Sequence, residues 1–487
     1  MKRLLTISLA VLLVLSVLAP ISLAEEKETV RYPFMVTMNP AEERQAVEDA
    51  VNALIGDKLN IKVELIGIEF GNWATQINNA FADGSLDVSS VPSNTPMAVL
   101  VDNGSIDEID DLLEKYGQGI LDTVGRYLVA TQMDGVTYGV PKVAAYGHRL
   151  AYILRKDLLE QAGLDQYYKN EMTMEEFNEF LKKAKEAYPD LTMMPAGKGG
   201  SYQTPFLIDT LGTTNLLVGL PLDGSTTVVN YYETKEFEDA LAMIKAWDEA
   251  DYFADDPLNS QDGGSAQVGN GTAFGVMLRY ANDAIAVNAH QNNIGYPICA
   301  ISVGPGPFMI TDSLTNGVYV IPSMSKHKEA AMKFLNELYI NPDLANLVCC
   351  GIENQHYVVK EDGTIDFYGD LNAVSTGWPS GMGTAWPNVT ISRPWAPNPP
   401  DLYEQWLKTN DECIESVAFG FAFNSIDVVD EITACNNVVN QYFNALMLNV
   451  GDQDALLAEF RAALKDAGID TIVAAKQEQL DKFFASK

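Results

Sequence analysis

The chain has 487 residues, with 32 Lys and Arg against 66 Asp and Glu, which gives a formal net charge of −34. At roughly 150 residues per domain, this length predicts two large lobes with room for a further unit. So acidic a surface repels phosphate backbones and anionic lipid heads, which disfavours nucleic acid as a partner. Most of the carboxylates serve solubility, and a neutral or weakly charged ligand fits the composition best.

The first 24 residues have the layout of a secretory signal peptide. Two basic residues precede an apolar run at positions 4–18, and Ser22-Leu23-Ala24 forms a small-x-small cleavage pattern. A transmembrane helix needs roughly 20 apolar residues, and Pro20 interrupts this run, so a permanent anchor is the weaker interpretation. We therefore expect an exported protein that is periplasmic or lies on the outer face of the cytoplasmic membrane.

Alternating strands and helices are predicted next. Val30 to Thr37 is a predicted strand, and Asn39-Pro40-Ala41-Glu42 is a helix start with a capping residue and a proline at the first helical position. The helix that follows has apolar residues at the spacing of one buried face and a glycine as its expected stop: Val47, Ala50, Val51, Leu54, Ile55 and Gly56. The second unit comprises a strand, a helix, a turn and a short strand: Ile61 to Ile66, Ala74 to Ala82, Asp83-Gly84 and Leu86 to Val88. Strand, helix and strand with short connections imply parallel pairing.

Further along the chain the helices carry clear start signals. Thr173 is placed to cap a helix over Met174 to Ala187, and a second helix is predicted over Lys235 to Ala250. Lys328 to Tyr339 is an amphipathic helix, and Asn341-Pro342 starts another one. By contrast, residues 374–400 hold three tryptophans among many glycines and prolines, so an irregular loop rich in large rings is expected there.

The last segment, Phe419 to Phe484, carries a resemblance. Its opening Gly420-Phe421-Ala422-Phe423-Asn424, its turn Ala467-Gly468-Ile469-Asp470 and its tail Gln477 to Phe483 resemble the C-terminal module of LipO-like solute-binding proteins of ABC importers. Two further stretches resemble the places where family 1 solute-binding proteins cross between lobes: Tyr138 to Asp157 for the outward crossing and Asn316 to Pro322 for the return.

The resemblance implies an α/β, two-lobed periplasmic-binding-protein-like fold of type II with a ligand cleft between hinged lobes. The domains it implies are a signal peptide at 1–24, an N-terminal lobe at 25–143 and 315–348, a C-terminal lobe at 144–314 and 349–418, and the module at 419–487. It further implies capture of a carbohydrate, most often an oligosaccharide, by a monomer that delivers it to ABC permease subunits. Family members are usually tethered through a cysteine after the signal, and this chain has none before Cys299, which argues against lipoprotein anchoring.

Candidate ligand-binding residues follow from this topology, because ligands of two-lobed α/β proteins sit beyond the carboxyl ends of strands. A sugar packs its apolar face on aromatic rings and needs hydrogen-bonding partners for its hydroxyls. The resemblance places the Trp386 loop beside the cleft, in the second lobe. For Tyr146 the alternative is a solvent-facing strut, and any single ring is as often core as ligand platform. The predicted site residues are Ser93, Asn94, Tyr146, Tyr202, Gln203, Arg279, Tyr280 and Trp386.

No catalytic or cofactor motif is present in the sequence. There is no Gly-x-Ser-x-Gly, Walker loop, His-Glu-x-x-His or dinucleotide fingerprint, and the four histidines show no metal-ligand spacing. We therefore expect a binding protein without cofactor, metal or enzymatic activity. A secreted glycan hydrolase or lyase and a ligand-presenting sensor remain the alternatives, as do a monosaccharide or a peptide for the ligand.

Overall fold

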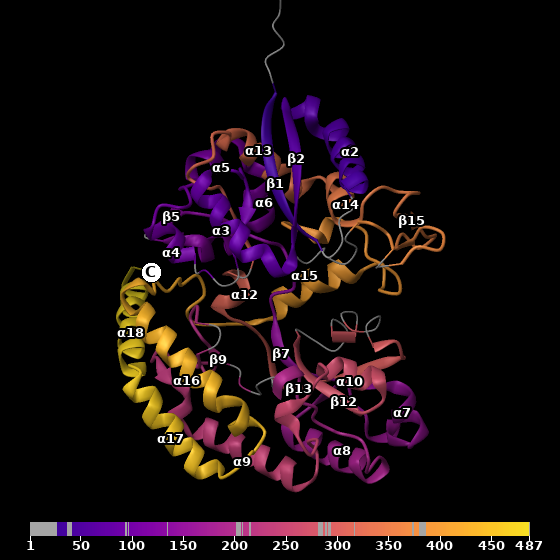
Figure 1. Ribbon diagram of the computed structural model, residues 1–487, viewed down its shortest axis with the longest axis vertical. Coiled ribbons are helices and arrows are strands. Elements are labelled where there is room, and N and C mark those ends of the chain that lie inside the picture. The colour runs from indigo at the N-terminus through magenta and orange to yellow at the C-terminus, as the bar shows by residue number, and fades with distance from the viewer. Residues whose placement is uncertain are drawn as a thin grey trace, which may run out of the picture.

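The computed structural model describes residues 27–36, 41–92, 95, 97–133, 135–200, 206, 208–213, 216–280, 286–287, 290, 294–315, 317–372, 375–378 and 386–486. The expected signal peptide lies outside these residues. Two α/β lobes lie one above the other in Figure 1, and three C-terminal helices extend along one side.

The first lobe is built on a parallel strand pair. β1 (Glu28–Val36) and β2 (Ile61–Glu69) pair in parallel along their whole length, joined by α2 (Ala41–Leu59), which confirms the predicted unit. The remaining strands and helices of the lobe are α3 (Trp73–Asp83), β3 (Ser89–Ser90), α4 (Met97–Asp102), α5 (Asp110–Tyr116), α6 (Gln118–Val124), η2 (Gly125–Thr131), β4 (Gln132–Met133), β5 (Val136–Thr137), β6 (Val140–Pro141), β14 (Val318–Val320), α13 (Lys328–Ile340), α14 (Pro342–Cys350), β15 (Tyr357–Val359), β16 (Ile365–Phe367) and η8 (Val389–Ile391).

Two local predictions for this lobe are wrong. Helix α2 continues past Gly56 to Leu59, and Leu54 is 38% exposed although its neighbours Val51 and Ile55 are fully buried. A Cβ at Gly56 would lie 3.1 Å from the carbonyl oxygen of Ile61, so this glycine serves a close approach to β2 rather than a helix stop. The short strand expected at Leu86 to Val88 is β3, a few residues later, and it pairs antiparallel with β14 instead of in parallel with β2, so the predicted parallel pairing of the second unit is also wrong.

The second lobe is built on a mixed five-stranded sheet, in which β7 (His148–Arg155) lies antiparallel between β12 (Gly275–Tyr280) and β13 (Ile298–Met309). The predicted cap at Thr173 is confirmed, since its hydroxyl accepts from the N–H of Glu176 at the start of α8 (Met174–Ala187). The other elements are α7 (Lys156–Gln161), η3 (Leu164–Tyr167), β8 (Glu171–Met172), η4 (Lys198–Gly200), β9 (Ile208–Asp209), β10 (Val218–Pro221), β11 (Val229–Asn230), η5 (Tyr231–Glu233), α9 (Lys235–Glu249), η6 (Pro257–Asn259), α10 (Gly264–Asn270) and α12 (Thr311–Thr315).

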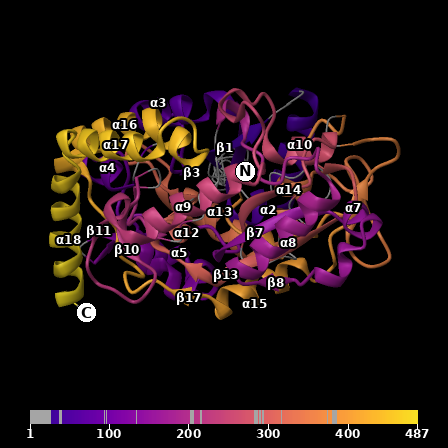
Figure 2. The ribbon, with the colours of Figure 1, turned by 90° about the horizontal axis from the view of Figure 1, so that it is seen from below.

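The chain ends in a helical module that packs on the second lobe. It follows α15 (Leu402–Glu412), β17 (Ile414–Glu415) and η9 (Ile426–Val428), and consists of α16 (Val429–Met447), α17 (Gln453–Asp466) and α18 (Ile469–Ser486). Figure 2 shows these helices grouped at one edge of the molecule. Buried residues of all three, including Cys435, Phe460 and Leu480, belong to the same hydrophobic core as the helices α8 and α9.

The described residues between 349 and 395 pack differently from the expected division into lobes. The buried residues Cys349, Tyr357, Trp378 and Trp386 share one core with β1 and α2 of the first lobe, whereas the resemblance places this stretch in the second lobe. Trp406 of α15 packs against the same core, and β17 then pairs with β13 of the second lobe. The chain therefore crosses between the lobes a third time, near the end of α15.

In the part of the chain that the structure describes, no helix combines the length and the apolar character needed to cross a bilayer. The five cysteines are free, and Cys349, Cys350 and Cys435 are buried. The cysteine pair Cys413 and Cys435, which the sequence left open as a disulfide, is not bridged.

Candidate ligand-binding site

The three crossings between the lobes meet in one small hydrophobic core. This core, which we call the hinge core, combines Ala130 of η2, Tyr146 of the first crossing and Met309 and Leu314 of the second, with Phe419 packed against it from the third. Side chains from four separate segments of the chain thus hold the junction together. Rotation of one lobe against the other requires these segments to bend together, because each crossing is packed on the others.

Asn410 fixes the first crossing to the third. It is 3% exposed, its Oδ1 accepts from the N–H of Tyr146 at 2.7 Å, and its Nδ2 donates to the carbonyl oxygen of Ala144 at 2.7 Å. The first crossing is also tied to the first lobe, since the N–H of Val143 donates to the carbonyl oxygen of Pro387 at 2.7 Å. A single buried amide therefore satisfies two backbone groups of a segment that has no regular strand partner there.

Tyr146 lies in the hinge core and is 3% exposed. Its hydroxyl donates to the carbonyl oxygen of Lys142 at 2.5 Å, its ring lies 5.0 Å from the ring of Tyr127, and burial raises its pKa. The residue is thus a buried strut, neither solvent-facing nor exposed to a ligand in this conformation. Its role as a ligand contact stays a prediction.

Trp386 lies in the wall of the first lobe rather than the second. Its ring is 4% exposed and stacks on Tyr32 and Phe34 of β1, with centroid distances of 5.8 and 6.3 Å. Pro387, the next residue, pairs with the first crossing at Val143, so the tryptophan stands close to the hinge. A cavity of about 20 Å³ adjoins the ring and is lined by Tyr32, Pro33, Phe34, Met35, Trp73, Ser90, Tyr319 and Trp386. We call it the tryptophan cavity.

Arg279 and Tyr280 end β12 on opposite faces of the sheet, because side chains alternate along a strand. Arg279 donates to the carbonyl oxygen of Phe206, and burial lowers its pKa to about 10. Burial, together with the nearby Arg279 charge, lowers the pKa of His148 to about 4. On the other face, the Tyr280 hydroxyl contacts Nε2 of His290 at 2.7 Å.

The remaining predicted site residues, Ser93, Asn94, Tyr202 and Gln203, lie outside the described residues. The structure therefore places Tyr146 in the first crossing with Trp386 near it, and Arg279 beside His148 at one end of the second-lobe sheet. The predicted site residues include neither Trp73 nor His148. The available signal for Trp73 was its position a few residues beyond the carboxyl end of β2, after the short η1 (Phe70–Asn72), since ligand-facing residues gather beyond strand ends.

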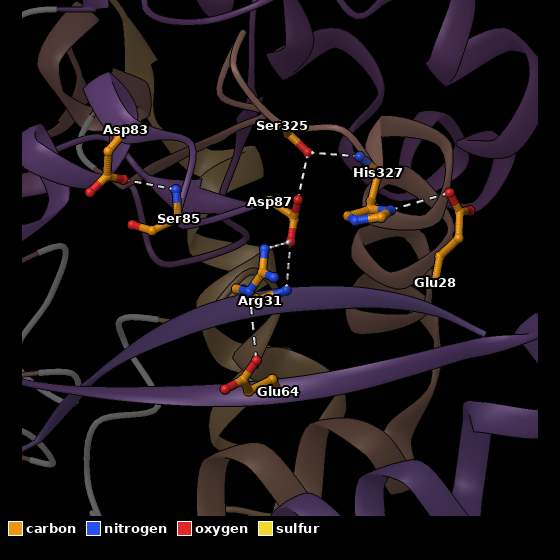
Figure 3. A network of polar contacts seen from close by, with 8 residues as sticks. All are labelled: Glu28, Arg31, Glu64, Asp83, Ser85, Asp87, Ser325 and His327. Atoms are coloured by element: carbon orange, nitrogen blue, oxygen red, sulfur yellow. Dashed lines mark hydrogen bonds and ion pairs between the residues drawn. The ribbon is translucent and has the colours of Figure 1, made fainter. Parts of the chain in front are cut away.

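A larger cavity than the tryptophan cavity lies elsewhere, in the first lobe. It measures about 720 Å³ and is bordered by β2, the end of α3 and the segment Met324 to His327. Figure 3 shows its polar network: Asp87 accepts from the Ser325 hydroxyl at 2.7 Å and from the N–H of Arg31 at 2.9 Å. Of the predicted site residues that the structure describes, none lines this cavity, and each of its central carboxylates already has a protein partner, so we do not place the ligand there.

Comparison with known proteins identifies the family. The model of bacterial extracellular solute-binding proteins matches residues 42–341, and that of a domain of unknown function (DUF3502) matches residues 417–485. A carbohydrate ABC transporter substrate-binding protein of Streptococcus pneumoniae serotype 4 is 25% identical over 455 residues, which covers 90% of this chain and 87% of the relative.

Solved structures agree with this assignment at the level of the fold. An N-glycan transport solute-binding protein of Streptococcus pneumoniae matches with a TM-score of 0.79 at 22% identity, over 94% of this chain and 99% of the other. Its complex with Man5GlcNAc matches with a TM-score of 0.69 at 22% identity, over 95% and 99% of the two chains. A human milk oligosaccharide-binding protein of Bifidobacterium longum infantis matches with a TM-score of 0.64 at 16% identity, over 94% and 99%. These matches confirm the predicted two-lobed fold, and the chain belongs to the family of bacterial extracellular solute-binding proteins.

Proposed function

We propose that the protein is the solute-binding subunit of an ABC importer. It captures a carbohydrate, specifically an oligosaccharide, by closing its two lobes on the ligand. One observation carries the proposal. The three crossings between the lobes converge in the hinge core, and the stacked rings of Tyr32 and Trp386 in the first lobe lie near it. A ligand that touches both lobes shifts the population toward the closed form by its differential affinity for that form. The relative that transports carbohydrate and the N-glycan and milk-oligosaccharide binders support this ligand class.

The proposal includes release of the ligand unaltered and delivery to a membrane permease by an exported monomer. The relatives are binding proteins of transporters, and catalysis is not part of the proposed activity. We further propose that the segment from Cys349 to α15 belongs to the first lobe, with the module as a third unit. The proposed site residues on the described part of the chain are Tyr146, Arg279, Tyr280 and Trp386, and those outside it are Ser93, Asn94, Tyr202 and Gln203.

Calorimetry with a glycan panel tests the ligand class. The panel contains Man5GlcNAc, a milk tetrasaccharide, maltotetraose and a tetrapeptide, and each mixture is analysed by mass spectrometry after the titration. Saturable binding of an intact glycan supports the proposal. Shortened products would establish a glycan-active enzyme instead, and binding of the peptide alone would replace carbohydrate as the ligand class.

Small-angle scattering tests lobe closure on the same samples. The radius of gyration is expected to fall when the glycan saturates the protein, because a ligand held between the lobes brings them together. Identical profiles with and without bound glycan would rule out capture by closure. Light scattering on the peak eluted from a size-exclusion column tests whether the protein is a monomer. Co-purification with a permease would support the importer role, and co-purification with a receptor kinase would support the sensor role.

A further inference from the structure

The indole N–H of Trp386 is a buried donor without an acceptor among the described residues. The side chain that carries it is 4% exposed, so solvent reaches the group poorly. Buried Trp N–H groups usually find a partner, because a donor that loses water without gaining an acceptor destabilises the folded state. An unpaired group of this kind in a native protein calls for an explanation.

Trp378 provides an internal comparison. It belongs to the same core, is 2% exposed and stacks on the same Phe34 ring with a centroid distance of 5.0 Å. Its Nε1 nevertheless donates to the carbonyl oxygen of Val348 at 3.2 Å. Two equally buried tryptophans on one phenylalanine thus differ in whether the donor is satisfied, so burial by itself does not account for the unpaired group.

The tryptophan cavity gives the donor a place for an acceptor. Its volume of about 20 Å³ exceeds the roughly 10–15 Å³ that a single water-sized group requires, and it is far too small for a sugar ring. The cavity lies where β1 and β3, strands of two separate sheets, both end, with Met35 and Ser90 in its lining, and ligands of α/β lobes bind beyond such strand ends. The ring that carries the donor stands next to the first crossing.

We propose that the tryptophan cavity is a specificity pocket that receives one hydroxyl oxygen of the bound carbohydrate, with the Trp386 indole N–H as its donor. This inference rests on the proposed function and adds to it that the protein selects its ligand by the presence of one hydroxyl group. A site built to hydrogen-bond a ligand hydroxyl rejects the analogue that lacks it more strongly than an apolar site rejects an extra group. The protein is therefore expected to distinguish glycans by one hydroxyl whose oxygen fits this pocket.

Matched tryptophan variants test the proposal. Trp386→Phe removes the N–H and keeps a flat apolar ring, and Trp378→Phe makes the same change at the satisfied donor. Binding of Man5GlcNAc, or of whichever panel glycan the wild type binds, is measured by calorimetry. Trp386→Phe is expected to weaken binding at least tenfold, and Trp378→Phe less than threefold, with both variants checked for folding by circular dichroism.

A second measurement leaves the pocket intact. NMR of the wild type labelled with ¹⁵N-tryptophan records one indole N–H signal for each tryptophan. The Trp386 signal is assigned because it is missing from the spectrum of Trp386→Phe. Saturation with the glycan is expected to move that signal and to leave the Trp378 signal in place. Unchanged affinity in Trp386→Phe, or an indole signal that does not respond to bound glycan, overturns the pocket and leaves the proposed function standing. Failure of the wild type to bind any glycan overturns the proposed function itself.

Discussion

Lys476 is a fully buried ammonium that joins the C-terminal module to the second lobe. It projects from α18, and its Nζ donates to the carbonyl oxygens of Thr210 and Val218, each at 2.6 Å, and to the hydroxyl of Thr213 at 2.5 Å. Burial lowers its pKa from the ordinary 10.5 to about 7, although two buried carboxylates, Asp209 and Asp312, act in the opposite direction. The interface therefore contains a group whose protonation depends on folding.

The sign of the pH effect follows from the lowered pKa of Lys476. Between pH 7 and 10.5 the unfolded chain holds a proton at this residue that the folded chain has lost, so folding stability rises with pH in that window. The slope is about 1.4 kcal/mol per pH unit, and the whole interval corresponds to about 5 kcal/mol. As pH falls from 10.5 to 7 this contribution is lost, and below pH 7 both states hold the proton, so the folded protein bears the full cost of the buried ammonium.

Lys476→Met keeps the length of the side chain and removes its charge and its donors. At pH 9 we expect a loss of about 4 kcal/mol in the free energy of unfolding, since the neutral amine of the wild type donates two hydrogen bonds and each acceptor left unpaired costs about 1–3 kcal/mol. At pH 6 we expect a loss of only about 1 kcal/mol, because the wild type then carries the cost of its ammonium. Lys476 thus stabilises the protein most where it is neutral.

Urea unfolding of both proteins at pH 6, 7, 8 and 9, followed by circular dichroism, measures the difference. Lys482→Met on the same helix is the control, since that lysine is exposed and pairs only with Glu478 in the next turn. Parallel pH profiles for wild type and Lys476→Met would refute the assignment of the titration to Lys476. A more stable variant at pH 9 would refute the structural role of the three hydrogen bonds.

Three further changes test the hinge, the second lobe and a helix cap by thermal and urea unfolding. Asn410→Ala leaves two buried backbone groups of the first crossing unpaired and is expected to lose about 2–5 kcal/mol, whereas an effect below 1 kcal/mol would show that water replaces the amide. Gly219→Ala places a Cβ 1.9 Å from the carbonyl oxygen of Asp209 and is expected to lose more than about 2 kcal/mol, against no measurable loss for Gly263→Ala, which meets open space. Thr173→Ala removes the capping box and is expected to lose about 1 kcal/mol, with Thr173→Ser as the neutral control.

Local signals predicted the helices well where one residue decides the boundary. The cap at Thr173 and the Asn341 start of α14 depend on a side chain reaching an N–H two or three residues away, which the sequence displays directly. Gly56 shows the limit of the same reasoning. Glycine there accommodates the nearby backbone of Ile61, and Asn60, with a positive φ of 54°, follows the last residue of the helix.

Local sequence patterns could not predict the lobe in which Trp386 packs. The sequence predicted an irregular loop rich in rings, but which core those rings join depends on contacts with Tyr32 and Phe34, strand residues near the other end of the chain. The same holds for Tyr146, whose burial is decided by Tyr127 and Asn410 from two other segments. Hydrophobic periodicity identifies a buried face and carries no information about the partner face.

The module and the hinge are mechanically distinct in this arrangement. The module shares its core with the second lobe and is held there by Lys476, while Asn424, just before α16, reaches the first lobe through a 2.8 Å hydrogen bond to Asp102 at the end of α4. Bending of the three crossings therefore carries the module with the second lobe and strains this polar contact. Because a partly exposed hydrogen bond contributes little compared with a buried core, the module permits lobe motion while it stiffens the lobe to which it is attached.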